Sequence, residues 1–216
     1  MSCNLKKYSL VLFFFISFHC NAQYQKPLLD IQVDSLIAAL HEQGMDTICI
    51  YQRYCVGCRG SYIREDSPCA SKVTLKPTYI FWKSRAKTYA AFRDNCTRAA
   101  PVLISKNDFW DYLIKHKDEI KKGEIKAFTV VDKKVDNGEP QSWRRDHGMH
   151  YGYVFYMRTD TVSQYIDAFD VQREKKFQKK TSKNVHYNQN TSSAIWKIVK
   201  QFEEAVLEIE KKHSIE

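Results

Sequence analysis

The 216-residue sequence contains no glycine-rich phosphate-binding loop and no Gly-x-Ser-x-Gly elbow. The first absence argues against a P-loop nucleotide-binding enzyme, and the second argues against a serine hydrolase of the α/β type. We also find no internal repeat. After residue 18 there is no second long apolar run, so we expect the mature protein to be soluble and to have no transmembrane segment.

The first 22 residues are typical of a secretory signal peptide. A basic start precedes an apolar run over residues 8–18, and Ala22 supplies the small residue at the expected cleavage site. The run is shorter than the about 20 apolar residues of a membrane-spanning helix, which disfavours a retained anchor. Lipid attachment at Cys20 is disfavoured because the preceding His19 is not small. We therefore expect an exported protein, periplasmic or extracellular.

Cleavage after Ala22 leaves residues 23–216, which suit a single α+β domain of ordinary size. The net charge then falls from +9 to +7 because Lys6 and Lys7 are removed. Outside the cytoplasm, clustered cysteines usually form disulfides. The mature chain keeps an odd number of cysteines, so at least one thiol is free or pairs between chains. These cysteines are Cys49, Cys55, Cys58, Cys69 and Cys96.

Hydrophobic periodicity predicts a largely antiparallel sheet of about five strands, packed against three to four helices and stapled by disulfides at one end. Helices are expected over residues 27–43, 107–120, 160–169 and 190–213. Strands are expected over residues 46–54, 79–83, 88–94, 125–131 and 150–158. Loops are expected over residues 132–147 and 171–190, and we expect the second of these, which is basic, to be mobile.

Apolar stripes predict which side of each helix is buried. Ser105 and Asp108 resemble a capping pair at the start of the second helix. The buried side of that helix is expected to consist of Phe109, Trp110, Leu113 and Ile114. The buried side of the last helix is expected to consist of Ile195, Ile198, Val199, Phe202, Val206 and Ile209.

Four cysteines are expected to gather at one end of the sheet if the first three strands form an antiparallel meander. These are Cys55, Cys58, Cys69 and Cys96. Structural disulfides are the favoured interpretation, with a preference for bonds that join Cys55 or Cys58 to one of the other two. A zinc site of four thiolates is disfavoured by the spacing and by an oxidising compartment. The third interpretation is a redox-active Cys55–Cys58 pair. Cys49, in mid-strand, is expected to be a small buried apolar group.

One further stretch favours the redox interpretation. Residues 76–83, Lys-Pro-Thr-Tyr-Ile-Phe-Trp-Lys, resemble the proline-led strand that lies opposite the Cys-x-x-Cys of the thioredoxin family. Cys55, nearest the strand end, is then the accessible nucleophile and Cys58 the resolving thiol. The resemblance covers about a dozen residues and lacks the family's long helix after the second cysteine. We therefore do not place the chain in that family.

Two histidines, His147 and His150, lie at the start of an aromatic strand. With Asp146 they have the residue types for a metal site or for proton transfer. No glutamate-bearing helix accompanies them, so a polar loop that enters a strand is the favoured interpretation. We expect neither a metal nor a cofactor.

The basic run over residues 173–183 is the main candidate for binding, although such runs are commonly only solvated loops. Its proposed binding residues are Lys175, Lys176, Lys179 and Lys180. An acidic protein or an anionic glycan fits this charge, and export makes nucleic acid an unlikely partner. The leading hypothesis is a non-enzymatic binding protein, for example an inhibitor of an acidic exported protein. The alternative is an envelope thiol-disulfide oxidoreductase.

Overall fold

The computed structural model describes residues 28–56, 76–94, 97–131, 138–158, 160–177 and 180–213. The expected signal peptide lies outside these stretches, as do Cys58, Cys69, Cys96 and Lys179. Within the stretches, no helix combines the length and the apolar character needed to cross a membrane.

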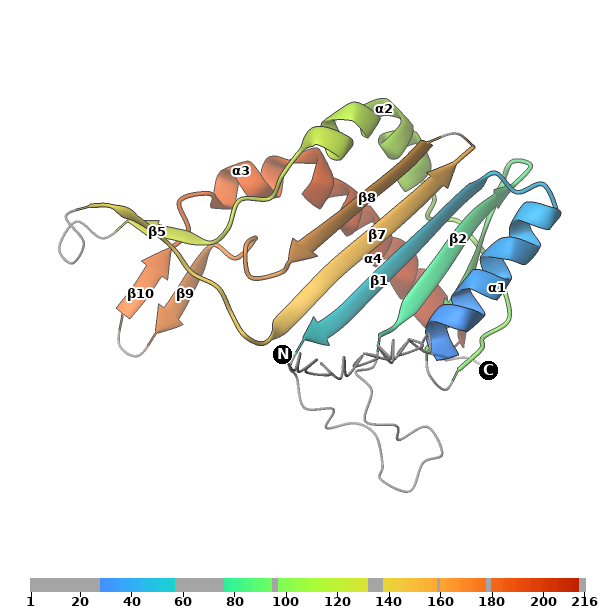
Figure 1. The fold of residues 1–216 in the computed structure, drawn as a ribbon, viewed down its shortest axis with the longest axis horizontal. Coiled ribbons are helices and arrows are strands. Elements are labelled where there is room, and N and C mark those ends of the chain that lie inside the picture. The colour runs from blue at the N-terminus through green and yellow to red at the C-terminus, as the bar shows by residue number, and fades with distance from the viewer. Residues whose placement is uncertain are drawn as a thin grey trace, which may run out of the picture.

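A six-stranded antiparallel sheet forms the centre of the molecule (Figure 1). Its strand order is β4-β3-β2-β1-β7-β8, and every neighbouring pair is antiparallel. The strands are β1 (Thr47–Val56), β2 (Thr78–Ser84), β3 (Lys87–Arg93), β4 (Val102–Ile104), β7 (Gly148–Met157) and β8 (Asp160–Asp167). The α+β class and the meander of β1, β2 and β3 are thus confirmed. Four of the five expected strands lie in this sheet, whereas β4 and β8 were not predicted as strands. Of the fifth, expected over residues 125–131, only residues 129–131 form a strand, which lies in a separate small sheet.

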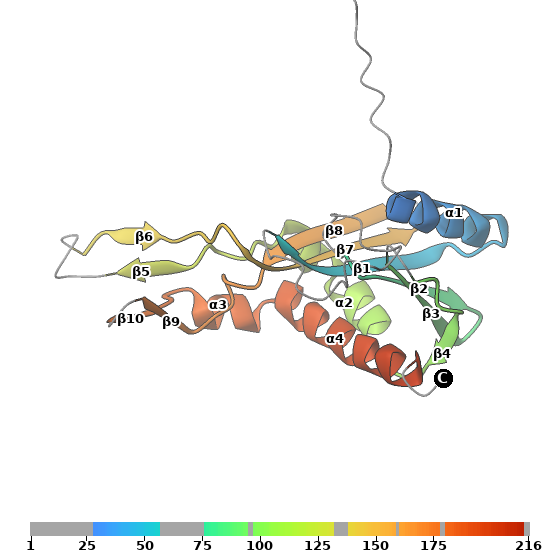
Figure 2. The same cartoon turned by 90° about the horizontal axis from the view of Figure 1, so that it is seen from below.

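Two helices, α2 (Phe109–Lys122) and α4 (Ala194–His213), cover one face of this sheet (Figure 2). All six α4 side chains that were predicted to be buried are buried. They pack against alternate residues of β1 and β7 in a core rich in aromatic rings. Its central ring is Phe202, whose centroid lies 4.8 Å from that of Tyr51 and 4.9 Å from that of Phe109.

The helix α1 (Leu28–Glu42) lies on the opposite face of the sheet, over β1, β2 and β3. Val33 and Leu40 are the buried residues of its apolar stripe. The helix ends as its sequence predicts, with Gly44 in the left-handed region at φ +76°. The Met45 N–H then donates to the carbonyl of Leu40 at 2.9 Å, which caps the helix.

Two small antiparallel sheets extend from one end of the molecule (Figure 2). They pair β5 (Thr129–Val131) with β6 (Pro140–Ser142) and β9 (Glu174–Phe177) with β10 (Lys180–Lys183), and α3 (Tyr187–Ser192) follows. Phe128, Trp143 and Phe169 pack between them. The Asn184 side chain also joins them, because its amide donates to the Asp170 carbonyl at 2.8 Å and accepts from β5. We call this part the basic arm; it comprises residues 128–131, 138–147 and 168–186.

The prediction of a helix over residues 160–169 is wrong, because this segment contains strand β8. Val162 and Ile166, which were assigned to one helical side, are both buried on one face of the strand. Residues four apart share a face in a helix and also in a strand, so their spacing fits both. The deciding feature is a tight turn after β7, where Arg158 has a positive φ of 39° and Met157 pairs with Asp160.

The prediction of a loop over residues 171–190 is also wrong, because this segment contains β9, β10 and α3. The shorter strand β6 lies within residues 132–147, which were likewise expected to form a loop. Both segments are polar on each face of their strands, so they lack the apolar alternation that identifies a half-buried strand.

The buried side of α2 differs from its prediction at one residue. Three of the four expected residues are buried, but Ile114 is 65% exposed and Ile120 is buried instead. The backbone of His116 is non-helical, with φ −111° and ψ 17°. This irregularity rotates the last turns of the helix relative to the first.

The predicted capping pair at the start of α2 is absent, because Asp108 makes no side-chain capping bond. The hydroxyl and N–H of Ser105 and the N–H of Lys106 instead donate to the Glu208 carboxylate of α4, at 2.9–3.1 Å. Lys212 lies 2.7 Å from the same carboxylate. Partial burial raises the pKa of Glu208, but Lys212 and these donors outweigh it and hold the pKa at about 2.

Replacing Glu208 with glutamine is expected to reduce the free energy of unfolding by about 1–2 kcal/mol at neutral pH, since it removes charge-assisted hydrogen bonds at a partly exposed site. A carboxylate with a lowered pKa stabilises the fold above its ordinary pKa of 4.5 and loses that effect as the pH falls toward about 2. Urea unfolding between pH 6 and pH 2 should therefore show the deficit shrinking with acid. Glu204→Gln, an exposed change on the same helix, is the control, and a deficit independent of pH contradicts this interpretation.

Candidate functional site

Of the five cysteines after residue 22, the structure describes two, Cys49 and Cys55. Cys49 is a free, fully buried thiol in β1, as predicted, and burial raises its pKa. Cys55 lies near the end of β1 opposite Met149. Because the other three cysteines of the predicted cluster lie outside the described residues, the disulfide at Cys55 and the stapling of the sheet end stay predictions.

The prediction that the cysteines gather requires the end of β1, the start of β2 and the end of β3 to lie at the same end of the sheet, and they do. Gln52 of β1 pairs with Thr78 of β2, and Thr78 pairs with Arg93 of β3. The chain therefore leaves β1, enters β2 and leaves β3 at one end of the sheet. This is the end that carries Cys55.

The two histidines do not form a metal site with Asp146. His147 is exposed, whereas His150 is 8% exposed on β7. Within the described stretches, no group of three or more His, Cys, Asp or Glu side chains is placed to hold a metal ion. The Nδ1 atom of His150 instead lies 2.5 Å from the Tyr165 hydroxyl.

The basic arm brings cationic side chains next to the half-buried Trp143 and the buried Phe169. A depression of about 530 Å³ is lined by Trp143, Arg144, Arg145, Phe169 and Lys175. The Arg145 guanidinium lies over the Phe169 ring, 5.6 Å from its centroid. The Phe169 ring also stacks on Phe128 at 4.5 Å, so the floor of the depression is fixed by the small core of the arm. We call this depression the arm pocket.

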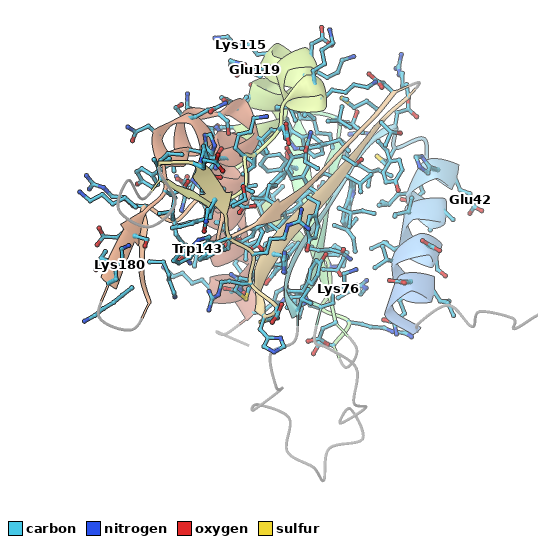
Figure 3. The ribbon with its side chains drawn as sticks, turned by 60° about the vertical axis from the view of Figure 1, so that its left-hand side comes forward. Glu42, Lys76, Lys115, Glu119, Trp143 and Lys180 are labelled. Atoms are coloured by element: carbon cyan, nitrogen blue, oxygen red, sulfur yellow. The ribbon has the colours of Figure 1, made fainter. Side chains whose placement is uncertain are left out.

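The arm as a whole has seven basic and four acidic residues among those described. The basic residues are Arg144, Arg145, Arg173, Lys175, Lys176, Lys180 and Lys183. One of the acids, Asp170, accepts the Phe128 N–H at 2.8 Å and so takes part in the fold of the arm. Figure 3 labels Trp143 and Lys180 on this part of the molecule.

The structure thus brings residues 143–145 and the β9–β10 hairpin together, although the sequence analysis considered them separately. Lys175, a predicted binding residue, lines the arm pocket, and Lys176 and Lys180 belong to the same hairpin. The prediction missed Arg144 and Arg145. The signal that could have found them is a tryptophan followed directly by two arginines, within a segment that was assigned to a loop.

A second depression, of about 470 Å³, lies on the face of the main sheet that also carries α1. Its lining includes Ile50, Gln52, Tyr54, Gly152, Val154, Ser163 and Tyr165. We call it the sheet depression. The side chains come from β1, β7 and β8, whereas α1 packs farther along the sheet, over β1, β2 and β3.

An aromatic cluster borders the sheet depression. The His150 ring lies 5.1 Å from that of Tyr165 and 5.9 Å from that of Tyr54. Tyr165 is 55% exposed, but its hydroxyl is held against His150. Burial of the hydroxyl, with Tyr54 and Asp167 nearby, raises the pKa of Tyr165 to about 12. The phenol therefore keeps its proton at neutral pH, and its hydroxyl shares a hydrogen bond with Nδ1 of His150.

A polar network on the other face holds α4 against the sheet. Tyr51 donates to Glu203 at 2.5 Å and Tyr79 donates to Glu210 at 2.7 Å, while Arg53 pairs with both carboxylates. Burial, together with the bonded carboxylates, raises the pKa of both phenols. The tyrosines therefore remain donors, and we assign the network a structural role.

Comparison of the chain with protein-family models, curated proteins and solved structures finds no match in any of the three. The function of the chain is therefore inferred from the arm pocket, the sheet depression and the cysteines.

Proposed function

We propose that this chain is an exported, non-enzymatic binding protein whose basic arm binds an acidic protein. The observation that carries the proposal is the arm pocket, in which three cationic side chains and two aromatic rings line one depression. The pattern of residues 1–22 supports export. The disulfide that the sequence predicts at Cys55 would fit an oxidising compartment.

The composition of the arm pocket favours a protein ligand. Tryptophan and arginine are the residues that most often dominate binding energy at protein interfaces. An arginine that lies over an aromatic ring, as Arg145 does, is held in place for a carboxylate before binding. The excess of positive charge on the arm also steers an acidic surface toward it. An anionic glycan is the alternative ligand for the same charges.

The proposal is tested with polyanions of both classes, poly-L-glutamate and heparin, on the full mature chain. Replacing Arg144, Arg145 and Lys175 together by serine is expected to weaken poly-L-glutamate binding by about tenfold or more, which corresponds to about 1.4 kcal/mol. The salt dependence of binding should also fall, because fewer ion pairs form. Isothermal titration calorimetry at several salt concentrations measures both effects.

The matched control removes the same number of charges elsewhere. Lys115, Lys197 and Lys211 are exposed lysines of α2 and α4, and their replacement by serine should leave binding within about twofold of the original. An equal loss in this control contradicts a site on the arm. Binding of heparin without binding of poly-L-glutamate assigns the arm to an anionic glycan instead.

The second candidate function is a thiol-disulfide oxidoreductase that uses Cys55 and Cys58. Strand β2, which follows Pro77, lies directly beside β1, whose end carries Cys55. This adjacency favours the resemblance of residues 76–83 to the proline-led strand of the thioredoxin family. The cysteine variants in the Discussion separate this candidate from a structural disulfide.

A further inference from the structure

Gly152 occupies the middle of β7, where nothing in the fold requires a glycine. Its φ lies outside the left-handed region, and a Cβ atom built on it meets no other atom within 4 Å. Neither backbone strain nor packing therefore explains the residue. A glycine inside a strand costs about 0.5–1 kcal/mol relative to alanine. Such a glycine often marks a place where a ligand approaches the backbone closely.

The neighbours of Gly152 form the walls of the sheet depression. Gln52 of β1 and Tyr165 of β8 lie directly opposite it on the two adjacent strands. Because neighbouring strands are about 4.8 Å apart, their Cα atoms are separated by about 10 Å, with only the glycine backbone between them. Along the strand, His150 and Val154 bound the gap two residues before and after the glycine. The empty position thus makes a shallow recess with side chains on every side.

We propose that the sheet depression binds one uncharged ring of a saccharide. The phenols of Tyr54 and Tyr165, the Gln52 amide and the Ser163 hydroxyl supply hydrogen-bonding groups along its walls. The Lys76 ammonium lies over the Tyr54 ring, 4.9 Å from its centroid, and one face of the Tyr165 ring stacks on His150. Because Tyr165 is 55% exposed, its ring still offers a flat surface with negative potential, which suits the C–H face of a sugar ring. None of the residues that line the depression carries a formal charge. The site therefore fits a ligand that is rich in hydroxyl groups and has no net charge.

The same observations disfavour other occupants. A peptide strand requires unpaired backbone groups, but β7 is paired with β1 on one side and β8 on the other. A wholly apolar ligand would meet only Ile50 and Val154 as aliphatic partners, on an open surface. A negatively charged ligand would instead bind the cationic side chains of the arm pocket. The proposal does not depend on anion binding by the arm.

The Gln52 side chain strengthens the case because it is held in place. Its Nε2 atom donates to the Thr78 hydroxyl at 3.0 Å, and Thr78 is buried. A side chain fixed in this way loses little conformational entropy on binding. Tyr165 is fixed similarly by its bond to His150. The recess is therefore organised before a ligand arrives.

The test fills the recess through the glycine that forms its floor. Gly152→Val places a β-branched side chain between Gln52 and Tyr165, and the open space around its Cβ predicts no loss of stability. The probes are cellohexaose, chitohexaose and maltohexaose, titrated into the full mature chain and followed by calorimetry and by NMR chemical shifts. We expect at least one of them to bind the unmodified protein, and Gly152→Val to weaken that binding by about tenfold or more.

The matched control is Gly148→Val, the same change on the same strand and face, outside the lining of the depression. A Cβ atom there meets only an Asp167 carboxylate oxygen at 3.7 Å, an ordinary contact. This variant should bind the saccharide within about twofold of the unmodified protein. Melting curves of both variants verify that they fold.

Three results would overturn the proposal. The first is that none of the three hexasaccharides binds the unmodified protein. The second is that Gly148→Val loses as much affinity as Gly152→Val. The third is that indole, added as a planar aromatic probe, binds in the depression while the saccharides do not.

Discussion

Replacing Phe202 with alanine is expected to reduce the free energy of unfolding by about 3–5 kcal/mol, the usual range for an aromatic residue deleted from a core. Phe202 is fully buried, and its ring touches rings from β1, β2, β7 and α2. These neighbouring rings, with centroids 4.8–5.8 Å away, are Tyr51, Phe81, Phe109, Tyr153 and Phe155. No single neighbour can fill the space that the ring leaves, so a cavity should remain.

Urea unfolding followed by circular dichroism measures this loss, and the melting temperature should fall by about 6–20 °C. Leu207→Ala is the control, since Leu207 lies on the same helix but is 62% exposed. Its effect should stay within about 0.5 kcal/mol. Equal effects of the two substitutions would mean that α4 does not dock on the sheet through Phe202.

The sequence predicts four of the six strands of the main sheet (β1, β2, β3 and β7) and the helices that cover its two faces, because the periodicities of these elements are unambiguous. In α4 the apolar residues recur at helical spacing over about four turns, and all six predicted positions are buried. In β1 the alternation of Ile48 and Ile50 with Cys49 and Tyr51 separates the two faces, and these residues contribute to the two different cores. Long-range packing agrees with local pattern in these elements, so either source leads to the same structure.

The misassigned elements are those whose local pattern fits two structures or none. Val162 and Ile166 of β8 satisfy a helix and a strand equally, and the deciding turn rests on the positive φ of Arg158, a residue type that rarely takes this conformation. The unpredicted strands of the arm, β6, β9 and β10, have no regular apolar alternation. The small core of the arm brings together Phe128, Trp143 and Phe169, which are separated by long stretches of sequence.

The candidate sites could be predicted only in part, for the same reason. The lysines of β9 and β10 stand out as a basic run, but the arm pocket also needs Arg144 and Arg145 from a distant segment. The sheet depression could not be found from sequence, because a glycine at position 152 becomes informative only when its cross-strand neighbours are known. Gln52 and Tyr165 lie 100 and 13 residues away from it along the chain.

Replacing Cys55 with serine is expected to destabilise the protein by about 2–5 kcal/mol, the usual cost of losing a structural disulfide. Cys55, which we expect to be disulfide-bonded, lies near the end of β1, where β1, β2 and β3 share one end of the sheet. A bond from this position to Cys69 or Cys96 would close a loop between separate strands, which restrains the unfolded chain most. The melting temperature of the oxidised variant should therefore lie clearly below that of the oxidised unmodified protein.

A redox-active pair predicts the opposite combination of results. If Cys55 bonds to Cys58, the closed loop is short and the exchange with external thiols is fast, so the serine variant loses thiol exchange while its melting temperature hardly changes. We expect peptide mapping under non-reducing conditions to find Cys55 joined to Cys69 or Cys96, and the unmodified protein to show negligible insulin reduction. A mapped Cys55–Cys58 bond, together with a thiol at Cys55 that reacts after mild reduction, would contradict the proposed binding function. It would favour the thiol-disulfide oxidoreductase instead.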